Sequence, residues 1–147
     1  LHDRAARRLA RAREMFEQLT EDDAAAYRFY REAATAPDAP GDPERVQLAL
    51  AAAVDVPREA AKLALAVLED LRSLVGKTSR WITGDLLAAA TLAAAVTRLC
   101  DYNVRANTGE VADREAAEEV RSSSAADVTR AETLLTEIET RAKSLLP

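Results

Sequence analysis

Four polar side chains interrupt the apolar stripes of two predicted helices, and they are the residues best suited to do chemistry. Over residues 3–36 apolar residues recur every three or four positions, and Asp23 stands where that stripe expects an apolar side chain. Over residues 85–107 a similar stripe starts at Asp85 and ends at Asn103, with Asn107 one turn further on the same side. A carboxylate in partly apolar surroundings can transfer protons, and an amide can orient a substrate. Because burying an unpaired carboxylate is costly, an aspartate in such a stripe marks either a polar network or a functional site.

The two ends of the second stripe are too far apart to share a site within one helix. Asp85 and Asn103 are separated by about five helical turns, which is about 27 Å at 1.5 Å per residue. One site can use both only when a second copy of the helix runs antiparallel beside the first. Such an arrangement is natural in a two-fold dimer.

Each of these residues also has a structural interpretation. Asp85 follows a Thr-Gly pair and fits a helix N-cap, whereas Asn103 fits a polar residue that fixes the alignment of packed helices. Asp23 closes an acidic run and fits a solvent-facing position. Tyr27 and Tyr30 fit half-buried places in a helical bundle better than they fit catalytic acids.

Positive charge gathers at the start of the chain, although the net charge of the whole is −5. The arginines concerned are Arg4, Arg7, Arg8, Arg11 and Arg13. Such a cluster is typical of a solvated face that pairs with acidic neighbours, and alternatively of an anion-binding face. The acidic balance of the chain as a whole argues against a nucleic-acid-binding protein.

Several kinds of site are excluded because the chain has one cysteine, Cys100, and one histidine, His2. No disulfide can form within the chain, and thiolate or imidazole metal sites and a Ser-His-Asp triad lack their residues. We therefore expect no metal and no bound cofactor. No apolar run reaches the roughly 18 residues of a membrane-spanning helix, and no secretory signal is present. We expect a cytoplasmic protein that spans no membrane.

The elements that must position the polar residues are long helices. The chain has 147 residues, of which 48% are hydrophobic and 4% aromatic, and strong helix formers dominate. This composition predicts one all-α domain over residues 1–147. Proline and glycine divide it into predicted helices at 3–36, 44–54, 57–75, 85–107 and 113–146, joined at 37–43 and 76–84. Because the first residue is Leu1 and not Met, we expect part of the N-terminus to be missing from this sequence.

The apolar residues of the later helices also advance in steps of three and four. In residues 113–146 the steps run from Ala117 to Leu145, and residues 57–75 follow the same rhythm. Such stripes pack helices side by side at small angles. We predict an up-and-down bundle of four to five long helices that dimerises through helix faces.

Four short segments resemble the cyclodeaminase/cyclohydrolase family, which includes formimidoyltetrahydrofolate cyclodeaminase and a bacterial methenyltetrahydrofolate cyclohydrolase. They are residues 19–27 (LTEDDAAAY), 54–61 (VDVPREAA), 84–90 (GDLLAAA) and 103–107 (NVRAN), in the order of the family and with similar separations. Two features depart from the family pattern. The sequence has no Gly-rich N-terminal segment, and Gly84 replaces the serine that usually precedes the aspartate.

The resemblance implies a helical, dimeric enzyme with its site near the dimer interface. A cyclodeaminase joins N10 of tetrahydrofolate to the 5-formimino carbon and expels ammonia, whereas a cyclohydrolase adds water to the 5,10-methenyl carbon. Asp23 or Asp85 would then be the acid–base catalyst, and a tetrahydrofolate derivative would be the substrate. Asn103 and Asn107 would orient the pterin or a water molecule. The expected substrate-binding residues are Asn103, Asn107, Arg105, Lys77, Arg80 and Tyr30, with the three basic ones available for the glutamate tail.

Three other functions fit the same sequence. A divergent member of the family without catalysis would serve as a ligand-binding or assembly module. An enzyme of the same fold could act on a C–N substrate other than a folate. A helical scaffold whose Arg-rich first helix docks an acidic partner needs only the composition, and its association would weaken strongly with salt.

Overall fold

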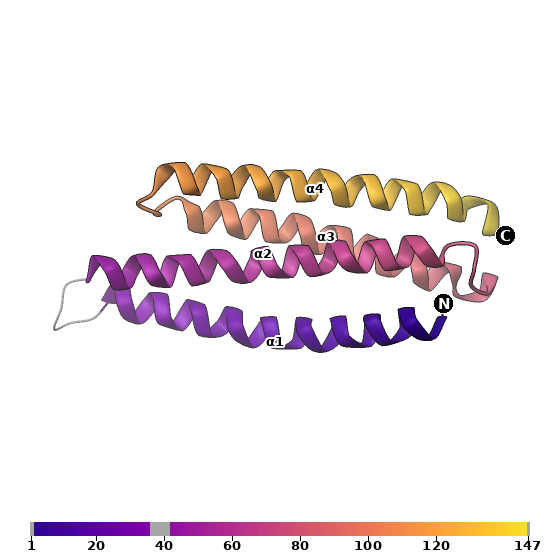
Figure 1. The fold of residues 1–147 in the computed structure, drawn as a ribbon, viewed down its shortest axis with the longest axis horizontal. Helices are drawn as coiled ribbons and strands as arrows, with labels where there is room; N and C mark the ends of the chain where they lie inside the picture. The colour runs from indigo at the N-terminus through magenta and orange to yellow at the C-terminus, as the bar shows by residue number, and fades with distance from the viewer. Residues whose placement is uncertain (1, 36–41, 147) are drawn as a thin grey trace.

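Four long helices make up the computed structural model, which describes residues 2–35 and 42–146. They are α1 (His2–Thr35), α2 (Pro43–Leu74), α3 (Thr83–Thr108) and α4 (Arg114–Ala142), with 3-10 turns η1 (Arg80–Ile82) and η2 (Lys143–Leu145). Each helix runs antiparallel to the one before it (Figure 1). No strand occurs in either described range. The prediction of an all-α, up-and-down bundle is confirmed.

The helices begin and end at residues whose side chains satisfy exposed backbone groups. The Asp42 carboxylate accepts a hydrogen bond from the Glu44 N–H at 3.1 Å, and the Asp113 carboxylate accepts one from the Ala116 N–H at 3.0 Å. Gly76, with a φ of 76°, turns the chain out of α2 as predicted. The other predicted connection, residues 37–43, falls mainly on residues 36–41, which lie outside the described residues.

Helix α2 continues through Pro57, so the two helices predicted at 44–54 and 57–75 are in fact one. A proline inside a helix has no N–H to donate to the carbonyl four residues earlier, which here is that of Ala53. Asn107 of α3 supplies the missing donor, because its Nδ2 lies 2.7 Å from the Ala53 carbonyl oxygen. The prediction was wrong because a partner distant in sequence repairs the break.

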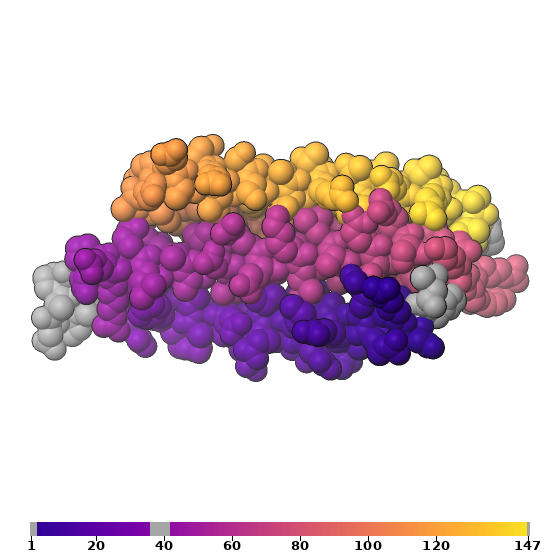
Figure 2. Space-filling view, viewed as in Figure 1, coloured from indigo at the N-terminus to yellow at the C-terminus, as the bar shows by residue number. Residues whose placement is uncertain are grey.

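Helix α2 is the centre of the bundle and packs against the three other helices. On the face seen in Figure 2 it separates α1 from α4. Helix α1 packs along α2 and makes no extensive contact with α3 or α4. A groove therefore remains between α1 and α3, with α2 as its floor. Its apolar part has a volume of about 600 Å³ and is lined mainly by Leu9, Ala12, Phe16, Val67, Ala89, Leu92, Ala93 and Val96.

The predicted apolar stripe of α3 is not the one that the bundle buries. The buried residues on this helix include Leu86, Ala90, Ala93, Thr97, Cys100 and Val104. On the predicted stripe, Leu92 is 68% exposed and Leu99 is 57% exposed. Alanine and leucine occur on most sides of this helix, so it has two apolar faces. The three-and-four spacing of apolar residues fitted both faces, and the prediction took the one that the bundle leaves exposed. The stripes predicted for the other long helices are largely buried or half-buried, and Asp23 is an exposed exception.

Ion pairs join neighbouring helices on the surface of the bundle. Lys62 lies 2.6 Å from Asp127, and Arg98 pairs with Glu132. In the Arg-rich start of α1, Arg8 pairs with Asp70 of α2 at 2.8 Å. Exposed pairs of this kind contribute about 0–1 kcal/mol each, so the apolar core carries most of the stability.

Candidate functional site

A cavity of about 390 Å³ opens between α1, α2 and α3 near the end of the bundle where α3 turns into α4. Ten residues line it, namely Asp23, Ala26, Tyr27 and Tyr30 of α1, Leu50 and Ala53 of α2, Asn103, Ala106 and Asn107 of α3, and Glu110 of the following turn. The fold thus brings together Asp23, Tyr30, Asn103 and Asn107, four of the residues predicted from sequence. They come from segments that lie far apart in the chain.

Asp23 lies on the side of α1 that faces α3. Its charge raises the pKa of Cys100, a buried thiol on α3, although burial of that thiol contributes more to the shift. Together the two effects raise the pKa of Cys100 from 9.0 to about 11. The Asp23 side chain is exposed and forms no ion pair or side-chain hydrogen bond with any residue that the structure describes. A substrate group or a water molecule can therefore reach this carboxylate.

Asn107 stands half-buried in the cavity wall, and the backbone of α2 holds its amide. The 2.7 Å bond from its Nδ2 to the Ala53 carbonyl exists because Pro57 leaves that carbonyl without a donor in its own helix. The segments that contain Pro57 and Asn107 are two of the four that resemble the cyclodeaminase/cyclohydrolase family. Of these two segments only the one with Asn107 lines the cavity, and the Pro57 segment acts on it through the freed Ala53 carbonyl that holds the Asn107 amide.

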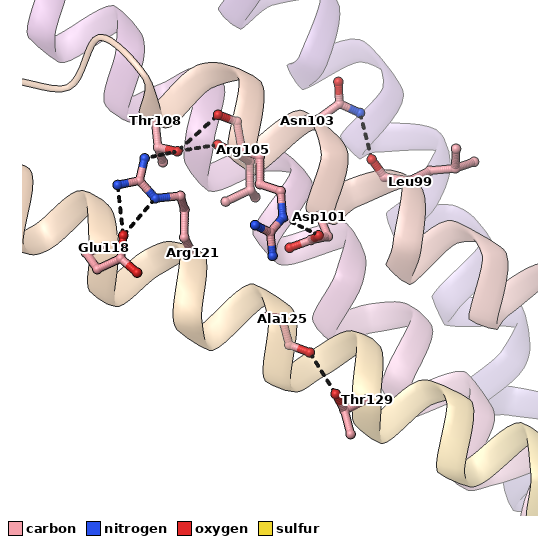
Figure 3. A network of polar contacts seen from close by, with 10 residues as sticks. Leu99, Asp101, Asn103, Arg105, Thr108, Glu118, Arg121, Ala125 and Thr129 are labelled. Carbon is pink, nitrogen blue, oxygen red and sulfur yellow. Dashed lines mark hydrogen bonds and ion pairs between the residues drawn. The ribbon is translucent and has the colours of Figure 1, made fainter.

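Asn103 reaches the cavity from one turn earlier in α3. Its Nδ2 donates to the Leu99 carbonyl oxygen at 3.2 Å, and Figure 3 shows the side chain lying back along its own helix. Its Oδ1 accepts no hydrogen bond from the described part of the chain. That oxygen can accept from an N–H or O–H of a ligand.

Arg105 lies on the other side of α3, toward α4 (Figure 3). Its Nε lies 2.7 Å from Oδ2 of the buried Asp101, and this hydrogen bond raises the pKa of Arg105. The second oxygen of Asp101, Oδ1, is buried and has no hydrogen-bond partner within the described ranges. Arg105 is therefore the partner of a buried carboxylate, and it does not line the cavity.

Asp85, Lys77 and Arg80 lie at the opposite end of the bundle from the cavity. Asp85 is exposed in the first turn of α3, and no side chain caps this helix, so Asp85 is not an N-cap. Lys77 is exposed in the turn after α2, and Arg80 stacks on Trp81 with its guanidinium 4.5 Å from the ring centroid. Within one chain these three residues therefore lie far from Asp23 and Asn103. This agrees with the expectation that α3 is too long for its two ends to share a site.

Glu110 is a cavity residue that the sequence analysis did not identify. It lies in the turn between α3 and α4, and Gln47 of α2 holds this turn at two points. The Gln47 Nε2 donates to the Glu110 carbonyl at 3.1 Å, and the Ala112 N–H donates to the Gln47 Oε1 at 2.8 Å. A turn carries no apolar periodicity, so the sequence held no signal that Glu110 would line the same cavity as Asp23.

The chemistry of the cavity is that of carboxylates, phenols and amides. Its lining contains Asp23 and Glu110 but no lysine, arginine or histidine. Such a lining favours a cationic group or one rich in N–H donors, and a carboxylate there can accept and return a proton. Within the described ranges no group of three or more His, Cys, Asp or Glu side chains is placed to hold a metal ion.

Comparison with known proteins identifies the family. A family model described as formiminotransferase-cyclodeaminase matches residues 2–126. The solved structure of a formiminotetrahydrofolate cyclodeaminase from Thermotoga maritima is similar, with a TM-score of 0.71 and 23% sequence identity. The match covers 93% of this chain and 65% of that one, so this chain spans less than two thirds of that protein. No curated protein sequence matches. The structural likeness shows the fold, and the family match over most of the length establishes that the chain belongs to the formiminotransferase-cyclodeaminase family.

Proposed function

We propose that the protein is a cyclodeaminase or cyclohydrolase that acts on a one-carbon-substituted tetrahydrofolate, 5-formimino or 5,10-methenyl, in the cavity between α1 and α3. The observation that carries the proposal is the convergence of Asp23, Tyr30, Asn103 and Asn107 on one cavity. Its volume of about 390 Å³ is within the range of small-molecule sites. Membership of the family supports a folate-like substrate.

Asp23 is the proposed proton carrier. In cyclodeamination N10 attacks the protonated formimino carbon and gives a tetrahedral carbon between nitrogens. Asp23 then takes the proton from N10 and delivers it to the former imino nitrogen, which leaves as ammonia while the 5,10-methenyl cation forms. No net proton is consumed, so a single accessible carboxylate suffices. In the cyclohydrolase reaction the same group would take a proton from the attacking water and return it to the departing ring nitrogen, and the second proton of that water is released to solvent as the formyl C=O bond forms.

The amides and phenol of the cavity orient the substrate in this proposal. Asn103 offers the free Oδ1, and Asn107 is held in place by its bond to Ala53. Tyr30, half-buried at the cavity, supplies an aromatic ring and a hydroxyl. Groups fixed by the fold before the substrate arrives lower the entropic cost of reaching the reactive geometry.

A second copy of the chain completes the proposed site. Helix α3 presents an exposed stripe that contains both small and large residues, namely Ala88, Leu92, Ala95, Leu99, Tyr102 and Ala106. Two copies placed antiparallel about a point between residues 93 and 94 set Leu92 against the partner's Ala95, and Ala88 against the partner's Leu99. Large residues then fill the space beside small ones.

The same pairing brings the distant predicted residues to the cavity. It sets Asp85 of one subunit against Tyr102 of the other, next to Asn103. The basic residues Lys77 and Arg80, which lie at the Asp85 end, approach the cavity of the other subunit, where they are available for the glutamate tail. A dimer with its sites near the interface therefore uses the predicted residues at both ends of α3 except Arg105, which pairs with Asp101.

The exposed apolar face of α3 is better suited to contact with a second copy of the chain than to contact with lipid. By length and composition residues 80–108 pass for a membrane-spanning helix, and only 28% of the most apolar window is buried in one subunit. However, this helix packs against α2 and α4, and its Arg98 forms an ion pair with Glu132 of α4. A second copy covers the outer face without burying these charges in lipid.

The test combines binding, turnover and size. We expect calorimetry to detect 5-formyltetrahydrofolate, a stable analogue of the formimino substrate, and an assay with that substrate to detect ammonia and the methenyl product together. Asp23→Asn should abolish turnover with unchanged helicity. The matched control is Asp22→Asn, because Asp22 bonds to Gln18 and lies outside the cavity.

The two ends of α3 are tested separately. Asp85→Ala and Asn103→Ala should each abolish turnover, and sedimentation should give a dimer. Wild-type rates in Asp23→Asn would contradict its role as proton carrier. Binding without turnover in the wild type would identify a ligand-binding module, and turnover of other C–N compounds alone would identify a non-folate enzyme.

A further inference from the structure

We propose that Glu110 is a specificity-determining residue that, together with Asp23, selects a positively charged N–C–N group, an amidinium, in the cavity. The preference for charge follows from the cavity itself. The identification of that group as the formimino group of a folate rests on the proposed function.

The first argument is the unbalanced charge of the cavity. Several acidic side chains elsewhere in the bundle that face a neighbouring helix pair with cations, as Asp70 does with Arg8 and Asp127 with Lys62. Asp23 and Glu110 form no ion pair or side-chain hydrogen bond with the described residues, and no cation lines their cavity. Two unpaired carboxylates at one cavity attract a cationic ligand and repel an anionic one.

The second argument is the way the structure fixes Glu110. Besides the two bonds from Gln47, the Arg114 Nη1 donates to the Gly109 carbonyl at 2.7 Å. The backbone on both sides of Glu110 is thus anchored, to α2 and to the start of α4. An anchored turn keeps Glu110 at the cavity without the entropic cost of ordering a loop when the ligand binds.

The third argument is the charge of the proposed reaction. The protonated formimino group, the tetrahedral species before it loses the N10 proton, and the methenyl product each carry one positive charge. While Asp23 holds the N10 proton, both Asp23 and the tetrahedral species are neutral, and Glu110 remains as the negative group at the cavity when the methenyl cation forms. Glu110 transfers no proton in this scheme, and its role is to keep a favourable charge beside the reacting centre throughout.

The test compares two small probes of nearly the same shape. Benzamidinium carries the N–C–N cation, and benzamide is its neutral counterpart. We expect amide NMR signals of residues at the cavity to shift with benzamidinium, and benzamide to bind at least tenfold more weakly. Glu110→Gln should remove most of this preference and keep the helicity, since the Glu110 side chain is exposed. Glu115→Gln, in the first turn of α4, is the matched control and should behave as the wild type.

The outcomes separate this inference from the proposed function. Equal binding of the two probes, or an unchanged preference in Glu110→Gln, would overturn the inference even if the protein turns over the formimino substrate. A charge preference that Glu110→Gln removes would support it even if no folate binds. Where turnover is found, Glu110→Gln should lower kcat/KM at least tenfold, and Glu110→Asp should restore part of it.

Discussion

The hydrogen bond between Asn107 and the Ala53 carbonyl makes a prediction about stability that involves Pro57. In Asn107→Ala the Ala53 carbonyl loses its donor, because Pro57 has no N–H to replace it. Leaving a buried carbonyl unpaired costs about 1–3 kcal/mol. Ala53 is only half-buried and borders the cavity, so water can reach it in part. We therefore expect a loss near the lower end, about 1–2 kcal/mol.

Pro57→Ala provides the decisive comparison. Alanine at position 57 has an N–H that can bond to the Ala53 carbonyl within α2, so Asn107→Ala should cost little in that background. The double-mutant cycle should then give a coupling energy of about 1 kcal/mol or more. Urea unfolding followed by circular dichroism measures it, provided that the denaturant slope is the same in all four proteins.

The control for this experiment is Asn103→Ala. The Asn103 amide also bonds to a backbone carbonyl, that of Leu99, but this carbonyl keeps the N–H of residue 103 as its ordinary helical donor. We expect a change within about 0.5 kcal/mol, as is usual for surface substitutions. Additive effects of Asn107→Ala and Pro57→Ala would refute the claim that the amide replaces the proline's missing donor.

Three further predictions concern Cys100, the α3–α4 turn and the outer face of α3. Folding raises the pKa of Cys100 from 9.0 to about 11. Below pH 9 the thiol is protonated in both the folded and the unfolded chain, and between pH 9 and 11 only the unfolded chain ionises. The free energy of unfolding should therefore fall by about 2–3 kcal/mol as the pH rises through this range. Asp23→Asn should lower this pKa and speed alkylation of the thiol at pH 9, and an unchanged rate would argue against their proximity. Gln47→Ala should increase amide hydrogen exchange over residues 109–112 and reduce kcat/KM, with no change at the far end of the bundle. Leu99→Asp should convert a dimer to a monomer in sedimentation and abolish turnover, and a dimer that persists would rule out the proposed pairing.

The fold followed from local features of the sequence to a large extent. Helix-forming composition, the stop at Gly76 and the caps at Asp42 and Asp113 are local, and they give the number and limits of most helices. The continuity of α2 through Pro57 was not predictable in this way, because it depends on Asn107, 50 residues further along the chain. Nor could spacing decide which side of the alanine-rich α3 faces the core.

The lining of the candidate cavity could be predicted in part. Asp23 and Asn103 were predicted because a polar residue in an apolar stripe is conspicuous, and both line the cavity; their catalytic and binding roles stay predictions. Glu110 was not found, because one acidic residue in a turn looks like any other. Arg105 is basic and close in sequence to the cavity residues, yet the rotation of the helix turns it toward Asp101. The sequence therefore indicated which segment of α3 borders the cavity, but not which of its residues lie on the side of the helix that faces the cavity.

The bond from Asn107 to Ala53 also settles how α2 and α3 are aligned along their length. Surfaces rich in alanine are smooth, and two such helices can slide past each other by one turn, about 5.4 Å, with little loss of contact. A slide of that size would leave both the Asn107 amide and the Ala53 carbonyl without a partner. The proline that weakens α2 as an isolated helix therefore supplies a fixed point between α2 and α3, and together with the bonds of Gln47 to the α3–α4 turn this point helps to set the position at which Asn103 and Glu110 border the cavity.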